Sequence, residues 1–218
     1  MRTPLTSVRS ISEILYNNPD IDAAQKKSFL EIIIKESERL TRLIVQVLDF
    51  EKIESGGTEW EISQVDFREV IKDAILATSR LMQDKKVRIE SHLPVSVPLI
   101  EGDKDRLIQV MVNLISNSIK FCDSDRGLIS VSLKARAGHL KVDVEDNGIG
   151  ISRKDQKIVF HEFQQVKDTS TGRPPGSGLG LSITKRIIDL KKGKIRVKSK
   201  PKKGSTFSFT LPLSNDSG

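Results

Sequence analysis

The chain has 218 residues, of which 37% are hydrophobic, and a formal net charge of +7. This allows one large domain or two small ones, and the single cysteine excludes an intramolecular disulfide framework. The single cysteine also fits a reducing cytoplasm, where we expect this protein. No apolar run approaches the ~20 residues of a membrane span, so we expect no direct membrane contact in this stretch, although a longer parent could be membrane-bound.

The first part of the chain, residues 1–56, predicts a helical hairpin. One helix runs from about Thr6, an Asn-Asn-Pro turn interrupts it, and Asp20 is expected to cap a second helix that extends to about Glu54. The second helix carries a heptad pattern with one polar member, at Phe29, Ile33, Glu36, Leu40, Leu43, Val47 and Phe50. Further apolar residues widen this face, so we expect a homodimer with a four-helix bundle. The alternative is that the hairpin packs on the rest of its own chain.

After a linker at residues 55–58, strands and helices are interleaved over residues 57–214. We expect helices over residues 67–82, 103–121, 153–160 and 180–190, and strands near residues 61–65, 87–93, 97–100, 128–135, 140–145, 195–199 and 207–211. Because the late strands come as hairpins, this part predicts an α+β fold, an α/β sandwich whose mixed sheet carries helices on one face.

Much of the excess positive charge lies between Lys185 and Lys203, a pattern that nucleic-acid-binding proteins also have. Residues 194–200, however, alternate basic with mostly apolar side chains, as one solvated strand face does. No aromatic residue interleaves with these charges to stack on bases. We therefore expect no nucleic-acid partner.

The helix predicted over residues 103–121 has a polar face. Asn113, Asn117 and Lys120 stand at positions i, i+4 and i+7 and therefore share this face. Amide oxygens are hard ligands that suit Mg²⁺, and a lysine can meet a phosphate as a point charge. The alternative is two solvent-facing asparagines and a surface lysine on an amphipathic helix.

The segment Asp146-Asn147-Gly148-Ile149-Gly150 directly follows a predicted strand. A carboxylate at this point can accept a hydrogen bond from the exocyclic amine of adenine, and the two glycines let backbone approach the base. An ordinary tight turn is the alternative. The residues that follow indicate a helix start, and not the second strand that such a turn would join.

A long loop over residues 164–178 precedes the helix predicted over residues 180–190, and loops of this length are usually lids or disordered segments. The loop ends in Gly176-Ser177-Gly178-Leu179-Gly180-Leu181, and the free N–H groups at a helix N-terminus favour phosphate. The spacing of its glycines fits neither the dinucleotide fingerprint nor a Walker loop.

Together these segments resemble the catalytic, ATP-binding domain of sensor histidine kinases of two-component systems, in the superfamily of the gyrase and mismatch-repair ATPases. Residues 103–121 are similar to the N box of that family, residues 146–150 to its first glycine box and residues 160–163 to its F box. Residues 176–181 are similar to its second glycine box, and residues 204–207 to its final strand signature.

The resemblance implies ATP and Mg²⁺ as cofactors. It implies adenine recognition by Asp146 and metal coordination chiefly by Asn117, with Asn113 assisting. Phosphate contacts would come from Lys120 and the backbone of residues 178–181, with a further nucleotide contact from Thr206. Phe160 and Phe163 would anchor the lid.

One residue position distinguishes the ATP hydrolases of the superfamily from its phosphotransferases. Its ATP hydrolases carry a glutamate one helical turn before the metal-binding asparagine, as the base that activates water. Asn113 stands at that position and cannot take up a proton. The resemblance therefore favours transfer to a protein acceptor.

Residues 1–7 are similar to the second half of the family's H box, His-Glu-Leu-Arg-Thr-Pro-Leu. In that alignment the phosphoacceptor histidine would precede residue 1, so we expect a fragment that does not autophosphorylate, and His92, His139 and His161 are expected at ordinary surface positions. The family implicates Thr3 in orienting water when a response regulator is dephosphorylated. The alternative for Thr3 is a plain first-turn residue.

The resemblance as a whole implies a protein-histidine kinase that works as a homodimer and signals through the receiver domain of a response regulator. Two alternatives stay open. One is a free-standing ATPase of the same superfamily. The other is a non-catalytic dimer scaffold that docks a response regulator.

Overall fold

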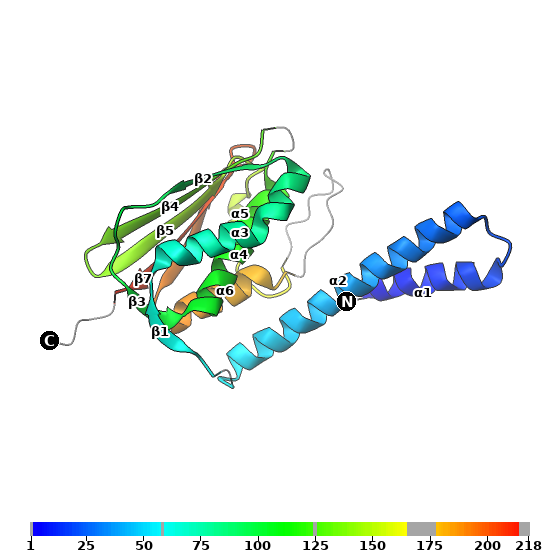
Figure 1. Cartoon of the computed structure of the whole chain (residues 1–218), viewed down its shortest axis with the longest axis horizontal. Coiled ribbons are helices and arrows are strands. Elements are labelled where there is room, and N and C mark those ends of the chain that lie inside the picture. The colour runs from blue at the N-terminus through cyan, green and yellow to red at the C-terminus, as the bar shows by residue number, and fades with distance from the viewer. Residues whose placement is uncertain (1, 58, 124–125, 165–177, 214–218) are drawn as a thin grey trace. The chain divides into compact units, whose positions relative to one another are not determined.

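The computed structural model describes residues 2–57, 59–123, 126–164 and 178–213 (Figure 1). The chain forms two compact units, Met1–Ser55 and Gly56–Gly218. Within the described residues, no helix is both long enough and apolar enough to cross a membrane.

The first unit is a hairpin of helices α1 (Arg2–Asn17) and α2 (Ala23–Glu54). The cap of α2 is Asp22, whose carboxylate accepts from the N–H groups of Ala24 and Gln25 at 2.8 and 3.1 Å, so the expectation for Asp20 is wrong. The heptad positions are half-buried, apart from Phe50, which is buried. Several neighbouring apolar side chains are 39–59% exposed in the single chain, namely Leu30, Ile32, Ile34, Ile44, Val45 and Leu48.

The second unit is built on a mixed five-stranded sheet with the order β2-β4-β5-β7-β6. Strand β2 (Arg88–His92) runs parallel to β4 (Leu128–Arg136). The other neighbours are antiparallel: β4 with β5 (His139–Asp146), β5 with β7 (Ser205–Pro212), and β7 with β6 (Lys194–Ser199). Strands β1 (Ile62–Val65) and β3 (Ile100–Asp103) form a separate two-stranded sheet. The strand expected near residues 97–100 therefore begins only at Ile100.

Helices α3 (Phe67–Lys85), α4 (Lys104–Phe121) and α6 (Gly180–Leu190) lie on one face of this sheet (Figure 1). Helix α5 (Arg153–Gln156) is shorter than the helix expected over residues 153–160. The core forms where the three long helices meet alternate strand residues, and includes Val70, Ile71, Ala74, Val110, Met111, Leu114, Val131, Val142, Val144, Ile187 and Phe209. This is the α+β fold, with helices on one face of a mixed sheet, that the sequence predicts.

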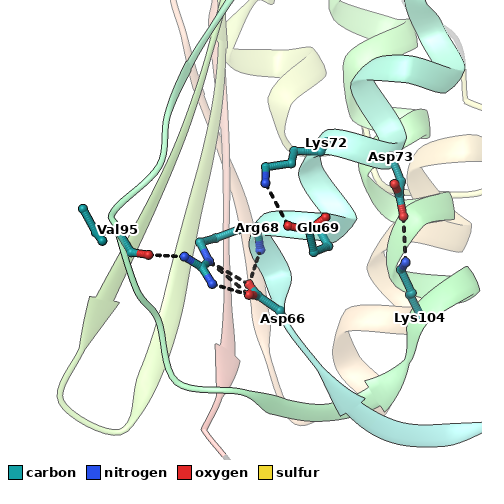
Figure 2. A network of polar contacts seen from close by, with 7 residues as sticks. All are labelled: Asp66, Arg68, Glu69, Lys72, Asp73, Val95 and Lys104. Atoms are coloured by element: carbon teal, nitrogen blue, oxygen red, sulfur yellow. Dashed lines mark hydrogen bonds and ion pairs between the residues drawn. The ribbon is translucent and has the colours of Figure 1, made fainter.

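Polar contacts surround the first turns of α3, and one of them joins α3 to the start of α4 (Figure 2). The guanidinium of Arg68 binds the carboxylate of Asp66, the N-cap of α3, and also donates to the carbonyl of Val95. The hydrogen bond from Arg68 lowers the pKa of Asp66. Lys104, the first residue of α4, pairs with Asp73 of α3 at 2.8 Å. This pair joins α3 to the first turn of α4, and α4 carries the polar face described above.

Candidate functional site

Helix α4 separates an apolar face from a polar one. Val110 and Leu114 are fully buried, whereas Asn113, Asn117 and Lys120 are half-buried. Its N-cap is Asp103, whose carboxylate accepts from the backbone of Arg106 at 3.1 Å. The expected polar triad therefore shares one partly accessible helix face.

Asn113 joins α4 to the first turns of α6. Its Nδ2 donates to the carbonyl oxygen of Gly180 at 3.2 Å and lies 3.4 Å from Oγ1 of Thr184. The N-cap of α6 is Leu179, which makes no side-chain capping hydrogen bond, and the first turn of α6 has no acidic residue. Such a helix start suits an anion.

Asp146 ends β5 as a buried carboxylate, only 6% exposed. Its Oδ1 accepts from the backbone N–H of Gly148 at 2.9 Å, and its Oδ2 accepts from Oγ of Ser118 at 3.5 Å. Burial raises the pKa of Asp146, although these bonds and one from the Ser205 backbone oppose the shift. Among the described residues, Asp146 forms no ion pair.

Asn147, which sequence reasoning did not single out, fastens this turn to the start of β4. Its Oδ1 accepts from the backbone of Leu128 at 3.0 Å, and its Nδ2 donates to the carbonyl of Arg126 at 2.6 Å. Sγ of the buried Cys122 lies 3.0 Å from the same Oδ1. Burial raises the pKa of this thiol.

The glycines at residues 148 and 150 accommodate neighbouring backbone. A Cβ atom on Gly148 would lie 2.1 Å from the carbonyl oxygen of Phe121, and one on Gly150 would lie 2.0 Å from that of Lys200. The backbone of Ile149 also donates to the Phe121 carbonyl at 3.1 Å. The turn after Asp146 is thus packed between the end of α4 and the β6–β7 connection.

The structure separates Thr206 from the Asp146 side chain. In the β5–β7 register, Thr206 stands opposite the exposed Glu145, and Ser205 stands opposite Asp146. Side chains alternate between the two faces of a strand. Ser205, which is 6% exposed, therefore shares the face of Asp146, whereas the nucleotide contact expected for Thr206 stays a prediction.

Phe160 and Phe163, the expected anchors of the lid, differ in how deeply their side chains are buried. Phe160 is half-buried and meets Phe207 edge to face, with ring centroids 6.2 Å apart. Phe163 is 58% exposed, and its backbone N–H donates to Gly178 at 3.0 Å. Gly176 lies outside the described residues, and Thr3 is described only as part of the α1 backbone.

Metal binding here would depend on amide oxygens. Within the part of the chain that the structure describes, no group of three or more His, Cys, Asp or Glu residues could hold a metal ion. Asn113 and Asn117 offer the neutral oxygen donors that suit Mg²⁺, an ion that is usually held by few protein ligands together with substrate phosphates. These residues fit such an ion.

Two family models match the chain. Residues 102–215 match the family described as "Histidine kinase-, DNA gyrase B-, and HSP90-like ATPase". Residues 1–56 match the "His Kinase A (phospho-acceptor) domain".

The chain is also similar to larger proteins. It is 35% identical to an uncharacterized sensor-like histidine kinase ycf26 of Pyropia yezoensis, over 99% of this chain and 35% of that protein. It is 34% identical to drug sensory protein A of Synechocystis sp., over 98% of this chain and 33% of that protein. The chain thus spans about a third of the length of these two relatives.

Solved structures share the fold. The Acinetobacter baumannii histidine kinase AdeS matches with a TM-score of 0.77 and 23% identity, over 98% of this chain and 97% of that one. Full-length ShkA in complex with AMPPNP matches with a TM-score of 0.74 and 25% identity, over 97% of this chain and 43% of that one. Histidine kinase ThkA in complex with response regulator protein TrrA matches with a TM-score of 0.78 and 22% identity, over 100% of this chain and 60% of that one.

Proposed function

Because this chain belongs to the sensor histidine kinases of the histidine kinase-, DNA gyrase B- and HSP90-like ATPase family, we propose that it binds Mg-ATP and directs the γ-phosphoryl group to a histidine. Residues 57–214 form the catalytic part in this proposal. Residues 1–56 form the dimerisation hairpin, and the protein works as a cytoplasmic homodimer.

The environment of Asp146 carries the proposal. Burying a carboxylate without a cation is unfavourable, and carboxyl groups whose pKa values are perturbed in this way concentrate at functional sites. The bonds from Gly148 and Ser118 leave further lone pairs on its two oxygens. These can accept a hydrogen bond from the exocyclic amine of adenine.

The phosphates would lie between α4 and α6. Asn117, assisted by Asn113, would hold Mg²⁺, and the bound ion would neutralise charge on the phosphates. Lys120 supplies a positive charge. The backbone of residues 178–181 supplies N–H groups at the start of α6, where no side chain caps the helix.

The side chain of Asn113 favours transfer over hydrolysis. An amide cannot accept a proton from water, so this position provides no general base. A histidine acceptor and then the receiver domain of a response regulator are therefore the proposed route. Thr3 would orient the water that dephosphorylates the response regulator. The complex of ThkA with the response regulator TrrA supports this class of partner.

Calorimetric titration with ADP tests the proposal. We expect Mg²⁺-dependent binding by the 218-residue chain, and Asp146→Asn should weaken it by about ten-fold or more, because a hydrogen bond to a charged group contributes about 1.5–3 kcal/mol. Unchanged affinity in this variant would remove Asp146 from the base site. Sustained ATP hydrolysis would instead support the free-standing ATPase.

A further inference from the structure

We propose that Thr184 is a positioning residue for Asn113: its hydroxyl oxygen holds the Asn113 amide so that Oδ1 is directed to the site of the metal and phosphates. The inference rests on the proposed function and deepens it. Thr184 lies in α6, 71 positions along the chain from Asn113, and is fully buried.

The chemistry of the two acceptors fixes which end of the amide faces α6. The carbonyl oxygen of Gly180 can only accept a hydrogen bond, so it must meet Nδ2 of Asn113, at 3.2 Å, and not Oδ1. The second contact, from Nδ2 to Oγ1 of Thr184 at 3.4 Å, then sets the rotation of the amide plane. A single acceptor would leave that rotation free.

This orientation leaves Oδ1 available. Among the described residues, no donor hydrogen bond to Oδ1 of Asn113 is present. A Cβ atom on Gly180 would lie 3.5 Å from Oδ1, an ordinary van der Waals contact, so this oxygen lies beside the start of α6. A metal ion, or a water that the ion holds, needs an oxygen donor and not an N–H group. Thr184 therefore acts on the ion through Asn113 without touching it.

The affinity test compares ADP binding with saturating Mg²⁺ and with EDTA. Thr184→Val should reduce the gain in affinity that Mg²⁺ provides by about three- to ten-fold, the range expected for one hydrogen bond, with little change in EDTA. Thr184→Ser, which keeps the hydroxyl, should restore the gain. Thr78→Val is a matched control, because Thr78 is also a buried threonine in a helix but, among the described residues, bonds only the carbonyls of Ala74 and Ile75.

A second readout needs no nucleotide. The side-chain NH₂ signals of Asn113 in a ¹H–¹⁵N spectrum, identified by their loss in Asn113→Ala, should move in Thr184→Val and stay in place in Thr184→Ser and Thr78→Val. If wild type binds Mg-ADP but Thr184→Val leaves both the magnesium gain and these signals unchanged, the inference is overturned while the proposed function stands. If wild type does not bind ADP at all, the proposed function fails, and the inference fails with it.

Discussion

Gly204 lies so close to Asp146 that a Cβ atom on residue 204 would stand 1.8 Å from the Asp146 carbonyl oxygen. The φ angle of Gly204 is +80°, in a region that L side chains rarely adopt. The connection between β6 and β7 thus packs directly against the backbone of the residue that we propose to bind adenine.

Gly204→Ala should therefore weaken ADP binding and lower the melting temperature, because the backbone of Asp146 must move to admit the methyl group. Gly138→Ala is the matched control: Gly138 has a φ angle of +74° in the β4–β5 turn, with nothing within 4 Å of its Cβ position. It should show only the backbone strain, on the order of 1 kcal/mol, and normal affinity. Equal loss of ADP binding in both variants would contradict this reading of Gly204.

Asp146→Asn should stabilise the nucleotide-free protein at neutral pH while it weakens ADP binding. Burial raises the pKa of Asp146, so ionisation increasingly disfavours the folded state as the pH rises from the unfolded pKa to the folded pKa. The advantage of the neutral amide should therefore grow as the pH rises from the unfolded value of about 3.9, be complete above the folded pKa, and vanish below the unfolded value. Urea unfolding at a series of pH values measures it.

Asp143→Asn provides a control of opposite sign on the same strand. Burial opposes ionisation of Asp143, but hydrogen bonds from Lys141 and Ser208 outweigh it and lower the pKa. The ionised form therefore stabilises the fold above about pH 3.9, and this contribution is lost as the pH falls through the folded pKa. The amide variant should be less stable than wild type at neutral pH. Stabilisation by both substitutions would mean that net charge, and not local environment, decides the effect.

Phosphotransfer should depend on an added acceptor. The 218 residues contain three histidines, His92, His139 and His161, none of them in α1 or α2. With γ-labelled ATP, we expect negligible labelling of this chain. A helical segment ending in His-Glu, joined directly before residue 1, should yield acid-labile, base-stable phosphohistidine, whereas an Ala-Glu ending should not. Labelling mapped to any of the three existing histidines would refute the alignment with the H box.

The exposed apolar side chains of α2 should hold two copies together. Burying one isoleucine contributes about 1.5–3 kcal/mol, so the combined Ile34→Glu and Ile44→Glu change should dissociate a dimer at micromolar concentration. Light scattering should give about twice 24.4 kDa for wild type and the monomer mass for the variant. Leu76→Glu, on a 73% exposed leucine of α3, is the control and should leave the mass unchanged. A monomeric wild type would refute the bundle.

Local patterns in the sequence predict the helices well, and tertiary context explains the misses. The 3.6-residue pattern locates α3, α4 and α6, since each buries one continuous stripe against the sheet. The cap of α2 is Asp22, and not the expected Asp20, because the turn after α1 continues to Ile21, whose N–H bonds the carbonyl of Asn18. Neither the parallel pairing of β2 with β4 nor the separate β1–β3 sheet follows from local patterns, because pairing joins residues far apart in the chain.

The part of the site that lies within a single helix could also be predicted from local sequence patterns. Asn113, Asn117 and Lys120 lie on one helix, so their common face follows from spacing alone. Counting back in twos from the apolar residues of β7 places Ser205 on the same face of the sheet as Asp146, and the nucleotide contact of Thr206 stays a prediction. The contact between Asn113 and Thr184 joins two helices, and no local pattern encodes it.

Strand β6 closes one side of the five-stranded sheet with Lys194, Arg196 and Lys198, all exposed. An uncovered strand edge offers unpaired backbone groups to which a strand of another molecule can add, the first step of aggregation. Three cations along this edge repel a second copy of the same edge. The basic side chains of β6 thus disfavour the pairing of this edge with the same edge of another molecule. This effect accounts for positive charge on β6 without a bound ligand.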